Sequence, residues 1–531
     1  MGVVGALKEG IVGIGGQAGP DSRLTLSSAG PGFGMWHLST NQAPADRSAM
    51  FETINLGEPM QHLHSFSILR IFVCLMTALV MLTVALALPG IPANAAAGIN
   101  RYVSPAGSNA PDCTNAAAPC KTITYALGQS QAGDTLLLDA GVYSEHLVIN
   151  KGIRIVQNPV KACPYLKLVL PLGLTLIPCA TLDGGLNGRV IEITSALAEV
   201  SLEKLTIRNG QVTDGSGAGI RSQGLLTIDN VSLHSNHIII SDLANPSNYE
   251  FRGGAIDNQN QLTLRNSSMH DNSAYNGGGI SSTGALLLVQ NTNIFANNAL
   301  HFGGGIWVPY GAPTTLENTT LYENSAVSSG GGMFIGNDGV PGNMGHAHLF
   351  RNVTISANTS SLGTGGLASY LQVNIDHSTL VLNSGFGNAT DLDLTESQVY
   401  HGYGYLHSSI TNTIVSHPSA TLPLCAICEA DSFVLSGGGN LSGDHSCDFT
   451  QPTDQVDTDP GLLPLAQNGG PVRTHALPFA SPAIDHASPY SLGADARGVV
   501  PQDGDLNGSV VPDSGAYEFT FIRTFLPMVR K

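Results

Sequence analysis

The chain has 531 residues, of which 63 are Gly, only 6% are aromatic and 11% are charged, and its formal net charge is −17. This composition suits tight turns and short strands better than charge-flanked amphipathic helices, so it argues against a helical bundle. The excess of acidic side chains also argues against nucleic acid as a partner, because affinity for nucleic acid rests largely on cationic contacts with phosphates.

The N-terminal part predicts export. Residues 1–59 are Gly-rich without periodicity, and we interpret them as a mis-assigned or disordered leader. Residues 60–95 have the layout of a secretory signal, since Arg70 lies in the apolar stretch 66–88 and an Ala-Asn-Ala sequence ends at Ala95, where cleavage is expected. The alternative is an uncleaved membrane anchor, because about 20 apolar residues suffice to span a bilayer. Either reading predicts a secreted or cell-surface protein.

Seven cysteines follow the signal in local groups. In an exported protein such groups predict disulfides that staple loops. A Cys-x-x-Cys pair alone is a weak zinc signal, since a second ligand pair at zinc-site spacing is missing. The pairing within the last three stays open. The disulfide candidates are Cys113, Cys120, Cys163, Cys179, Cys425, Cys428 and Cys447.

A repeat dominates the middle of the chain. Each unit places Asn at a turn, an apolar residue three positions later and a second Asn six positions after the first. The last unit has His377 in place of the first Asn and ends at Asn383. The pairs are Asn230 and Asn236, Asn266 and Asn272, Asn291 and Asn297, Asn318 and Asn324, and Asn352 and Asn358.

The spacing of these units predicts a solenoid. The second Asn recurs at intervals of 36, 25, 27, 34 and 25 residues, with Gly-rich strand starts such as the one at Gly303 between units. A period near 25 with short alternating strands means stacked coils, because no long helical periodicity accompanies it. We expect an all-β, right-handed parallel β-helix over 96–416, with its Asn residues in turn ladders rather than serving as glycosylation acceptors.

Three segments resemble known families. Residues 101–156 resemble the N-terminal part of bacterial right-handed β-helix surface proteins, in which a short helix, here near 123–131, caps the first coil. The alternation of Gly-rich starts and apolar-x-x-Asn over 217–383 is similar to polymorphic outer-membrane protein repeats. Residues 459–520, which contain a Gly-Ala-Tyr-Glu sequence, look like the closing segment of the choice-of-anchor Q family. The resemblances imply a secreted or surface-displayed β-helix. We expect residues 417–520 to complete or cap it.

The C-terminal segment contains a candidate calcium loop. Asp503, Asp505 and Asn507 place oxygen ligands at alternating positions before a Gly, and the stretch reaches Asp513. This pattern matches the opening of an EF-hand-like loop, although position twelve is Ser514 rather than Glu. Calcium is the one cofactor that the sequence suggests, and a plain acidic turn is the alternative.

The residues that could take part in catalysis are scattered along the sequence. Polysaccharide lyases with this fold need carboxylates for calcium and a Lys or Arg base, yet no Lys lies between Lys204 and Lys531. Carboxylates occur at unrelated repeat positions, namely Asp214, Asp257, Asp271, Asp376, Asp391 and Asp393. Aromatic side chains support glycan binding only as a contiguous exposed row, and the candidates are Trp307, Tyr310, Tyr322 and Tyr370.

The favoured function is therefore a non-catalytic adhesion or structural protein whose partner is an extracellular polysaccharide or another cell-surface component. The alternative is a polysaccharide-degrading enzyme, either pectate-lyase-like or a glycoside hydrolase. A convergent Asp/Arg cleft favours the enzyme, and a smooth Asn, Ser and Thr ladder favours the scaffold. Membrane contact is expected only through the signal segment or the tail 521–531, which we interpret as the end of the last strand.

Overall fold

A computed structural model describes residues 98–521 apart from internal gaps, and all of them belong to the compact unit Pro92–Lys531. The gaps are residues 111, 161–165, 170–172, 177–179, 242–249, 337–347, 395–406, 428–433 and 489–492. Outside the described residues lie the expected leader 1–59, the expected signal 60–95, the tail beyond Phe521, and Cys163, Cys179 and Cys428. Within the described part, no helix is both long enough and apolar enough to cross a bilayer.

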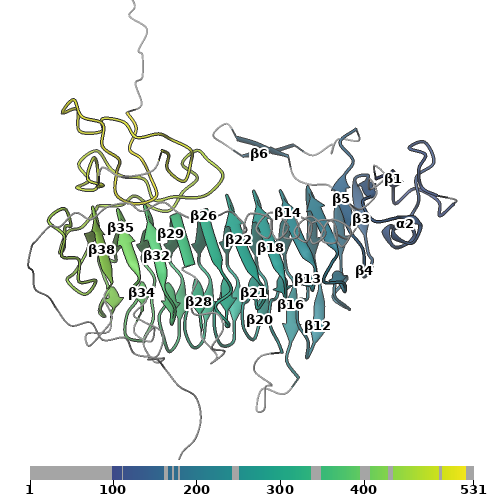
Figure 1. The fold of residues 1–531 in the computed structure, drawn as a ribbon, viewed down its shortest axis with the longest axis horizontal. Helices are drawn as coiled ribbons and strands as arrows, with labels where there is room; N and C mark the ends of the chain where they lie inside the picture. Colours follow the sequence, from purple (N-terminus) through teal and green to yellow (C-terminus); the bar gives the residue numbers. More distant parts are fainter. Residues whose placement is uncertain are drawn as a thin grey trace, which may run out of the picture. The chain divides into compact units, whose positions relative to one another are not determined.

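The chain winds into coils whose strands stack in parallel (Figure 1). The described part contains parallel sheets of 21, 10 and 6 strands. Each strand pairs with the equivalent strands of the coils before and after it, as Ile256 does with Ile220 and Ile280. The fold is a right-handed parallel β-helix, which confirms the predicted fold class.

The largest sheet has two strand columns that share the long strands β26 (Thr314–Tyr322) and β29 (His348–Ser356). The first column also contains β1 (Asn100–Val103), β2 (Thr135–Leu138), β5 (Ile153–Gln157), β10 (Glu199–Glu203), β14 (Leu225–Asp229), β18 (Gln261–Arg265), β22 (Leu286–Gln290), β32 (Val373–Asp376), β35 (Ser409–Thr411) and β38 (Leu435–Gly438). The second contains β3 (Gly141–Tyr143), β8 (Ala180–Asp183), β11 (Leu205–Arg208), β15 (Ser232–His234), β19 (Ser268–His270), β23 (Asn293–Phe295), β33 (Thr379–Val381), β36 (Ile414–Ser416) and β39 (Leu441–Ser442).

Two smaller parallel sheets complete the coils. One contains β4 (Leu147–Ile149), β9 (Ile191–Ile193), β13 (Ile220–Ser222), β17 (Ile256–Asn258), β21 (Ile280–Ser282), β25 (Ile306–Val308), β28 (Met333–Ile335), β31 (Leu367–Ser369), β34 (Leu392–Asp393) and β37 (Cys425–Ala426). The other contains β12 (Gln211–Thr213), β16 (His237–Ile239), β20 (Ser273–Ala274), β24 (Asn298–Ala299), β27 (Ser325–Ala326) and β30 (Thr359–Ser360). An antiparallel pair is formed by β6 (Leu166–Val169) and β7 (Gly173–Leu176).

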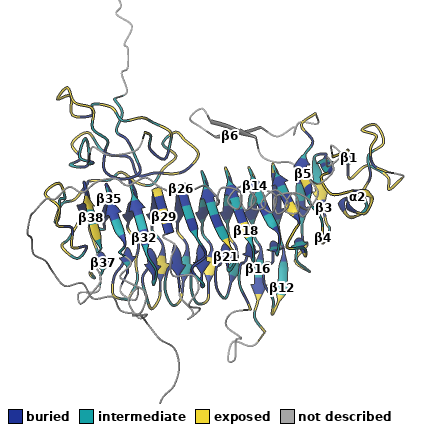
Figure 2. Ribbon diagram, viewed as in Figure 1, coloured by how far each residue is buried: buried dark blue, intermediate teal, exposed yellow. Residues whose placement is uncertain are grey.

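Inward-facing apolar side chains form one core along the stack (Figure 2). Ile256, Ile280 and Ile306 are fully buried, and each such side chain stabilises the fold by about 1.5–3 kcal/mol. The Gly-rich strand starts have a steric cause. Gly303 has a φ of 66°, and a Cβ there would lie 2.3 Å from the carbonyl oxygen of Ile306.

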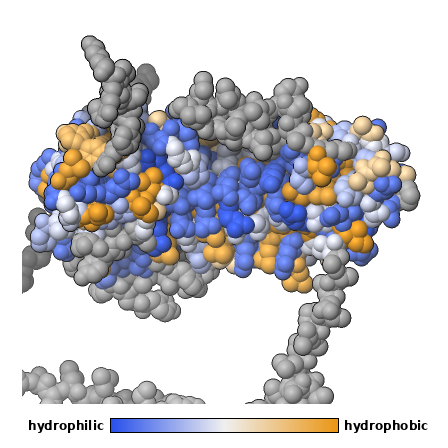
Figure 3. All heavy atoms as spheres, turned by 90° about the horizontal axis from the view of Figure 1, so that it is seen from above, coloured by the Kyte–Doolittle hydropathy of each residue, from blue (hydrophilic) through white to orange (hydrophobic). Residues whose placement is uncertain are grey.

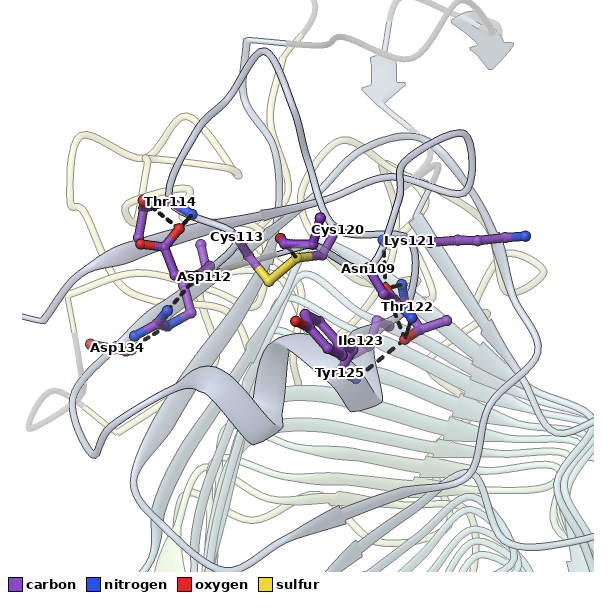
Figure 4. Close-up of a disulfide and its surroundings, with 12 residues drawn as sticks. Asn109, Asp112, Cys113, Thr114, Cys120, Lys121, Thr122, Ile123, Tyr125 and Asp134 are labelled. Atoms are coloured by element: carbon purple, nitrogen blue, oxygen red, sulfur yellow. Dashed lines mark hydrogen bonds and ion pairs between the residues drawn. A yellow bond between two sulfur atoms is a disulfide. The ribbon is translucent and has the colours of Figure 1, made fainter.

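A short helix, α2 (Ile123–Gln129), lies beside the first coils. The Thr122 hydroxyl accepts a hydrogen bond from the Tyr125 N–H, and the Glu145 carboxylate accepts from two N–H groups of the first turn. A carboxylate at this position also complements the positive end of the helix dipole. The disulfide between Cys113 and Cys120 lies next to the helix (Figure 4).

Six buried asparagines form a hydrogen-bonded column that we call the inner Asn ladder. At each step one Asn donates from both its backbone N–H and its side-chain amide to the Oδ1 atom of the next. Asn297 donates to Asn324 Oδ1 over 3.1 and 2.9 Å. At the end of the column Asn383 donates in the same way to Asp391, over 3.2 and 2.7 Å. The members are Asn236, Asn272, Asn297, Asn324, Asn358 and Asn383.

The first Asn of each repeat unit lies at a sharp turn. These residues have φ values between 46° and 56°, a left-handed conformation that Asn tolerates. From Asn266 to Asn352 their side chains bond from coil to coil, as Asn291 Nδ2 does to Asn266 Oδ1 over 3.1 Å, whereas the Asn266 amide donates to Asp229. His377 continues the turn with a φ of 44°. We call this set the outer Asn ladder, which comprises Asn230, Asn266, Asn291, Asn318 and Asn352.

The stack extends one coil beyond the boundary expected at Ser416. Strands β37, β38 and β39 pair in parallel with the preceding coil and end at Ser442. The repeated pair of asparagines is missing from this coil. A single residue, Asn440, bonds to the preceding coil, donating to Ile410 O and accepting from Thr413 N. A disulfide between Cys425 and Cys447 ties this coil to the following loop.

Candidate functional site

One row of side chains follows the outer face of the second strand column. Its members occupy the last position of β11, β15, β19 and β23 and of the long strand β26, and they are paired in register. The row therefore presents one side chain per coil at a spacing of about 4.8 Å. We call it the open row, and it consists of Arg208, His234, His270, Phe295 and Tyr322.

The four rings of the open row stack on one another. The ring centroids of His234 and His270 are 5.0 Å apart, those of His270 and Phe295 are 4.7 Å apart, and those of Phe295 and Tyr322 are 4.7 Å apart. Because stacking covers the ring faces inside the column, the row offers ring edges to the solvent. The rings of His234, His270 and Phe295 are partly exposed.

Polar partners orient the row. Arg208 donates to Asp183 over 2.9 Å, and the ring of His270 lies 2.8 Å from an oxygen of the exposed Asp271. Burial, followed by the nearby His270 and Arg208, lowers the pKa of His234 below its usual value. His234 is therefore neutral at pH 7 and serves as a hydrogen-bonding ring rather than as a cation.

The C-terminal segment, residues 459–521, crosses the sheet at one end of the row. Asn293 Nδ2 donates to Pro471 O over 3.1 Å, and Thr320 Oγ1 donates to Arg473 O over 2.6 Å. The guanidinium carbon of Arg473 lies 5.0 Å from the ring centroid of Tyr322, which is only 3% exposed. Residues 471–473 therefore cover the sheet beside Tyr322 and close the open row at this end. The uncovered face of the sheet next to the C-terminal segment is largely hydrophilic (Figure 3).

A cavity of about 370 Å³ lies between the sheet and the C-terminal segment. Its lining includes Val381, Ser416, Asp459 and His475, together with apolar side chains. His475 Nε2 lies 2.9 Å from the Oγ of Ser356, but its Nδ1 contacts a backbone carbonyl, and Ser356 does not line the cavity. This Ser–His contact therefore fastens the segment to the sheet.

The aromatic side chains named from the sequence divide between two places. Tyr322 belongs to the open row, whereas Trp307 packs with Phe334 on the outer side of the ten-stranded sheet and is 1% exposed. Tyr370 packs against the same cluster, and Tyr310 is half-buried. The sequence analysis did not single out His234, His270 or Phe295 because they differ in type, although each stands two residues before the second Asn of its repeat unit and this shared position could have identified them.

The carboxylates expected to be scattered stay apart. Asp257 is fully buried and bonds to Arg252 at 2.9 Å, while Asp214 bonds to Ser241 at an outer turn. Asp391 ends the inner Asn ladder. Asp214 and Asp391 lie outside the strands and have local partners, so they do not converge with Asp257. Asp257 itself belongs to a cluster of charges on the ten-stranded sheet, because Arg221 is its register partner and both Arg189 and Arg221 form ion pairs with Glu192.

The candidate calcium loop gains a ligand that the sequence did not suggest. Ligand oxygens of Asp485, Asp503 and Asp505 all lie within 4.8 Å of one another. The side-chain amide of Asn507 donates to Asp505 over 2.7 Å. Asp513 lies outside this set of three carboxylates, because it is 1% exposed and accepts hydrogen bonds from the backbone N–H groups of residues 485 and 519.

Two carboxylate oxygens at this loop lack a hydrogen-bond donor. Asp485 Oδ1 and Asp503 Oδ1 are shielded from solvent and have no hydrogen-bond donor. Burial raises the pKa of Asp485, with the charge of Asp505 adding to the effect. Burial also raises the pKa of Asp513 to about 7 and, together with the charge of Asp513, that of Glu518 to about 9. The region thus concentrates carboxyl groups at low solvent exposure, and their raised pKa values favour the neutral form of the buried ones.

Comparison with known proteins supports the fold and nothing beyond it. No protein-family model matches the chain, and no curated protein matches it. Pectate lyase Pel9A matches with a TM-score of 0.47 and 13% identity over 80% of this chain and 98% of that one. A rhamnogalacturonan lyase matches with a TM-score of 0.41 and 13% identity, over 70% and 92% of the two chains. XylC in complex with xylose matches with a TM-score of 0.39 and 9% identity, over 70% and 88%.

Proposed function

We propose that this chain is an exported polysaccharide-binding protein in which a glycan lies along the β-helix axis over the open row. The observation that carries the proposal is the in-register row from Arg208 to Tyr322 on a hydrophilic face. A coil spacing of about 4.8 Å resembles the length of one sugar unit, so successive sugars meet equivalent groups. The imidazole nitrogens of His234 and His270 and the flanking hydroxyls of Ser232 and Ser268 offer hydrogen bonds to sugar hydroxyls.

The proposal concerns binding at a surface-displayed scaffold. Arg208 is engaged by Asp183 and the ring of His270 lies against Asp271, so neighbouring carboxylates hold these two side chains in place. The two disulfides of the described part support an oxidising, extracellular compartment. Display at the cell surface and the choice-of-anchor type of C-terminal segment belong to the same proposal.

The test is a glycan array followed by calorimetry with the selected oligosaccharide. We expect His270→Ala to weaken binding by about tenfold, since it removes a ring from the middle of the row and about 1.4 kcal/mol corresponds to that factor. His237→Ala is the matched control, because its ring lies on β16 in a different sheet and bonds to Ser273 over 2.9 Å. Equal losses in both variants, or no binding to any glycan, contradict the proposal. Turnover of the bound glycan would show that the protein is an enzyme rather than a binding protein.

We also propose that Asp485, Asp503 and Asp505 bind calcium. Support comes from three convergent carboxylates, two of which hold buried oxygens without a donor, because a hard cation satisfies such oxygens. The ion would join the loop at 503–508 to the distant Asp485. Its role is therefore to fasten the C-terminal segment.

Calcium is expected to raise the thermal midpoint of the protein by several degrees, since a ligand that binds only the folded state stabilises it. Asp505→Asn should abolish that shift and the calcium-binding heat measured by calorimetry. Asp448→Asn is the control, because Asp448 is exposed at a turn with a φ of 50°, which Asn also adopts. An unchanged midpoint after addition of EGTA to the calcium-loaded protein would rule the site out.

A further inference from the structure

Arg473 is distinguished from the other arginines by its missing carboxylate partner. Within the described residues nine arginines form ion pairs with Asp or Glu, whereas Arg473 forms none. Its side chain is exposed, and its guanidinium lies over the ring of Tyr322. The paired arginines are Arg101, Arg154, Arg189, Arg208, Arg221, Arg252, Arg265, Arg351 and Arg497.

The backbone of Arg473 is held against the sheet on both sides. Its N–H donates to Asn293 Oδ1 over 3.2 Å, and its carbonyl oxygen accepts from Thr320 Oγ1 over 2.6 Å. The side chain therefore starts from a fixed point at the closed end of the open row. Less rotational freedom remains to be lost when a ligand binds there.

Tyr322, which lies under the guanidinium of Arg473, does not neutralise the charge of that guanidinium. Burial raises the pKa of Tyr322 to about 12, so the phenol stays neutral and supplies a ring face rather than an anion. A guanidinium stacked on a ring still presents its planar N–H donors at the edge, and these match the two oxygens of a carboxylate or sulfate.

Resting on the proposed polysaccharide-binding function, we infer that the open row receives the end of an acidic glycan. The anionic group of the terminal sugar, a carboxylate or a sulfate ester, binds Arg473. The chain extends from there over Phe295 and His270 towards Arg208. An internal segment of a glycan does not fit this arrangement, because residues 471–473 cross the face and block its continuation beyond Tyr322.

The experiment measures the affinity of length-matched oligosaccharides by calorimetry, using the full exported chain. One series is oligogalacturonate, the second is the same series with all carboxyl groups reduced, and the third has only the two terminal sugars reduced. A sulfated oligosaccharide provides the second anionic source. We expect the unmodified acid to bind about tenfold or more tightly than the end-reduced form, since a charge-assisted hydrogen bond is lost.

Arg473→Gln is expected to remove this acid preference and leave the affinity for the reduced oligosaccharide unchanged. The substitution keeps the backbone N–H and C=O that hold the segment on the sheet. Arg351→Gln is the matched control, because Arg351 is likewise exposed but is paired with Glu317 at 4.0 Å, outside the row. The preference should also fall with added salt, since the contact is exposed.

The outcomes separate this inference from the proposed function. Equal binding of acidic and reduced oligosaccharides overturns the acidic-end inference and leaves polysaccharide binding in place. A preference for acid that survives in Arg473→Gln also overturns it, because another group then reads the charge. If the end-reduced form binds as well as the unmodified acid, internal sugars are recognised instead. Failure of every oligosaccharide, neutral or acidic, removes both proposals.

Discussion

Replacing Asn324 by Leu is expected to lower the free energy of unfolding by about 3–5 kcal/mol. Asn324 is completely buried, and its side chain accepts two hydrogen bonds from Asn297 while its amide donates to Ile294 O and Asn358 Oδ1. Leu has a similar volume but leaves these neighbours without partners in the interior. The loss propagates along the column, because each amide is oriented by the next.

Chemical denaturation followed by circular dichroism measures this effect. Asn298→Ala is the control, since Asn298 lies nearby but is exposed, and its side-chain amide donates to Ser325 Oγ over 2.7 Å. We expect this control to change stability by less than about 0.5 kcal/mol. A cost below about 1 kcal/mol for Asn324→Leu would mean that the inner Asn ladder adds little to the stability of the stack.

Replacing Asp391 by Asn is expected to stabilise the protein above pH 7 and to flatten its pH dependence. Asp391 is fully buried at the end of the inner Asn ladder, and desolvation raises its pKa to about 7. Between its unfolded pKa of 3.8 and this value, the folded state binds the proton and the unfolded state does not. Stability therefore falls as the pH rises through this window, by on the order of 4 kcal/mol.

The difference between wild type and Asp391→Asn isolates this group, because Asp513 and Glu518 have raised pKa values of about 7 and about 9 and contribute with the same sign in both proteins. Urea unfolding at a series of pH values from 4 to 9 gives the two curves. Asp448→Asn, at an exposed turn, serves as the control with an unchanged curve. Parallel curves for wild type and Asp391→Asn would show that the buried carboxyl does not titrate in this range.

The repeat could be recognised in the sequence because a solenoid places equivalent residues at nearly constant separations. Asn324 and Asn358 occupy the same place in successive coils, so their spacing alone indicated stacking. Gly303 marks a strand start for an equally local reason, since its backbone conformation excludes a side chain. The end of the stack was less visible, because the last coil, up to Ser442, lacks the repeated Asn pair.

The sequence by itself therefore determined the β-helix, the turn positions of its asparagines and an acidic loop in the C-terminal segment. Only the tertiary structure decided which residues share a site. His270, Phe295 and Tyr322 occupy the same place in successive repeat units, two residues before the second Asn, but they differ in type, so only the structure showed that their rings stack into one row. Asp485 meets the loop at Asp503 because the C-terminal chain folds back on itself. Arg473 reaches Tyr322 across roughly 150 residues, a contact fixed by the packing of one segment on the sheet and by no local pattern.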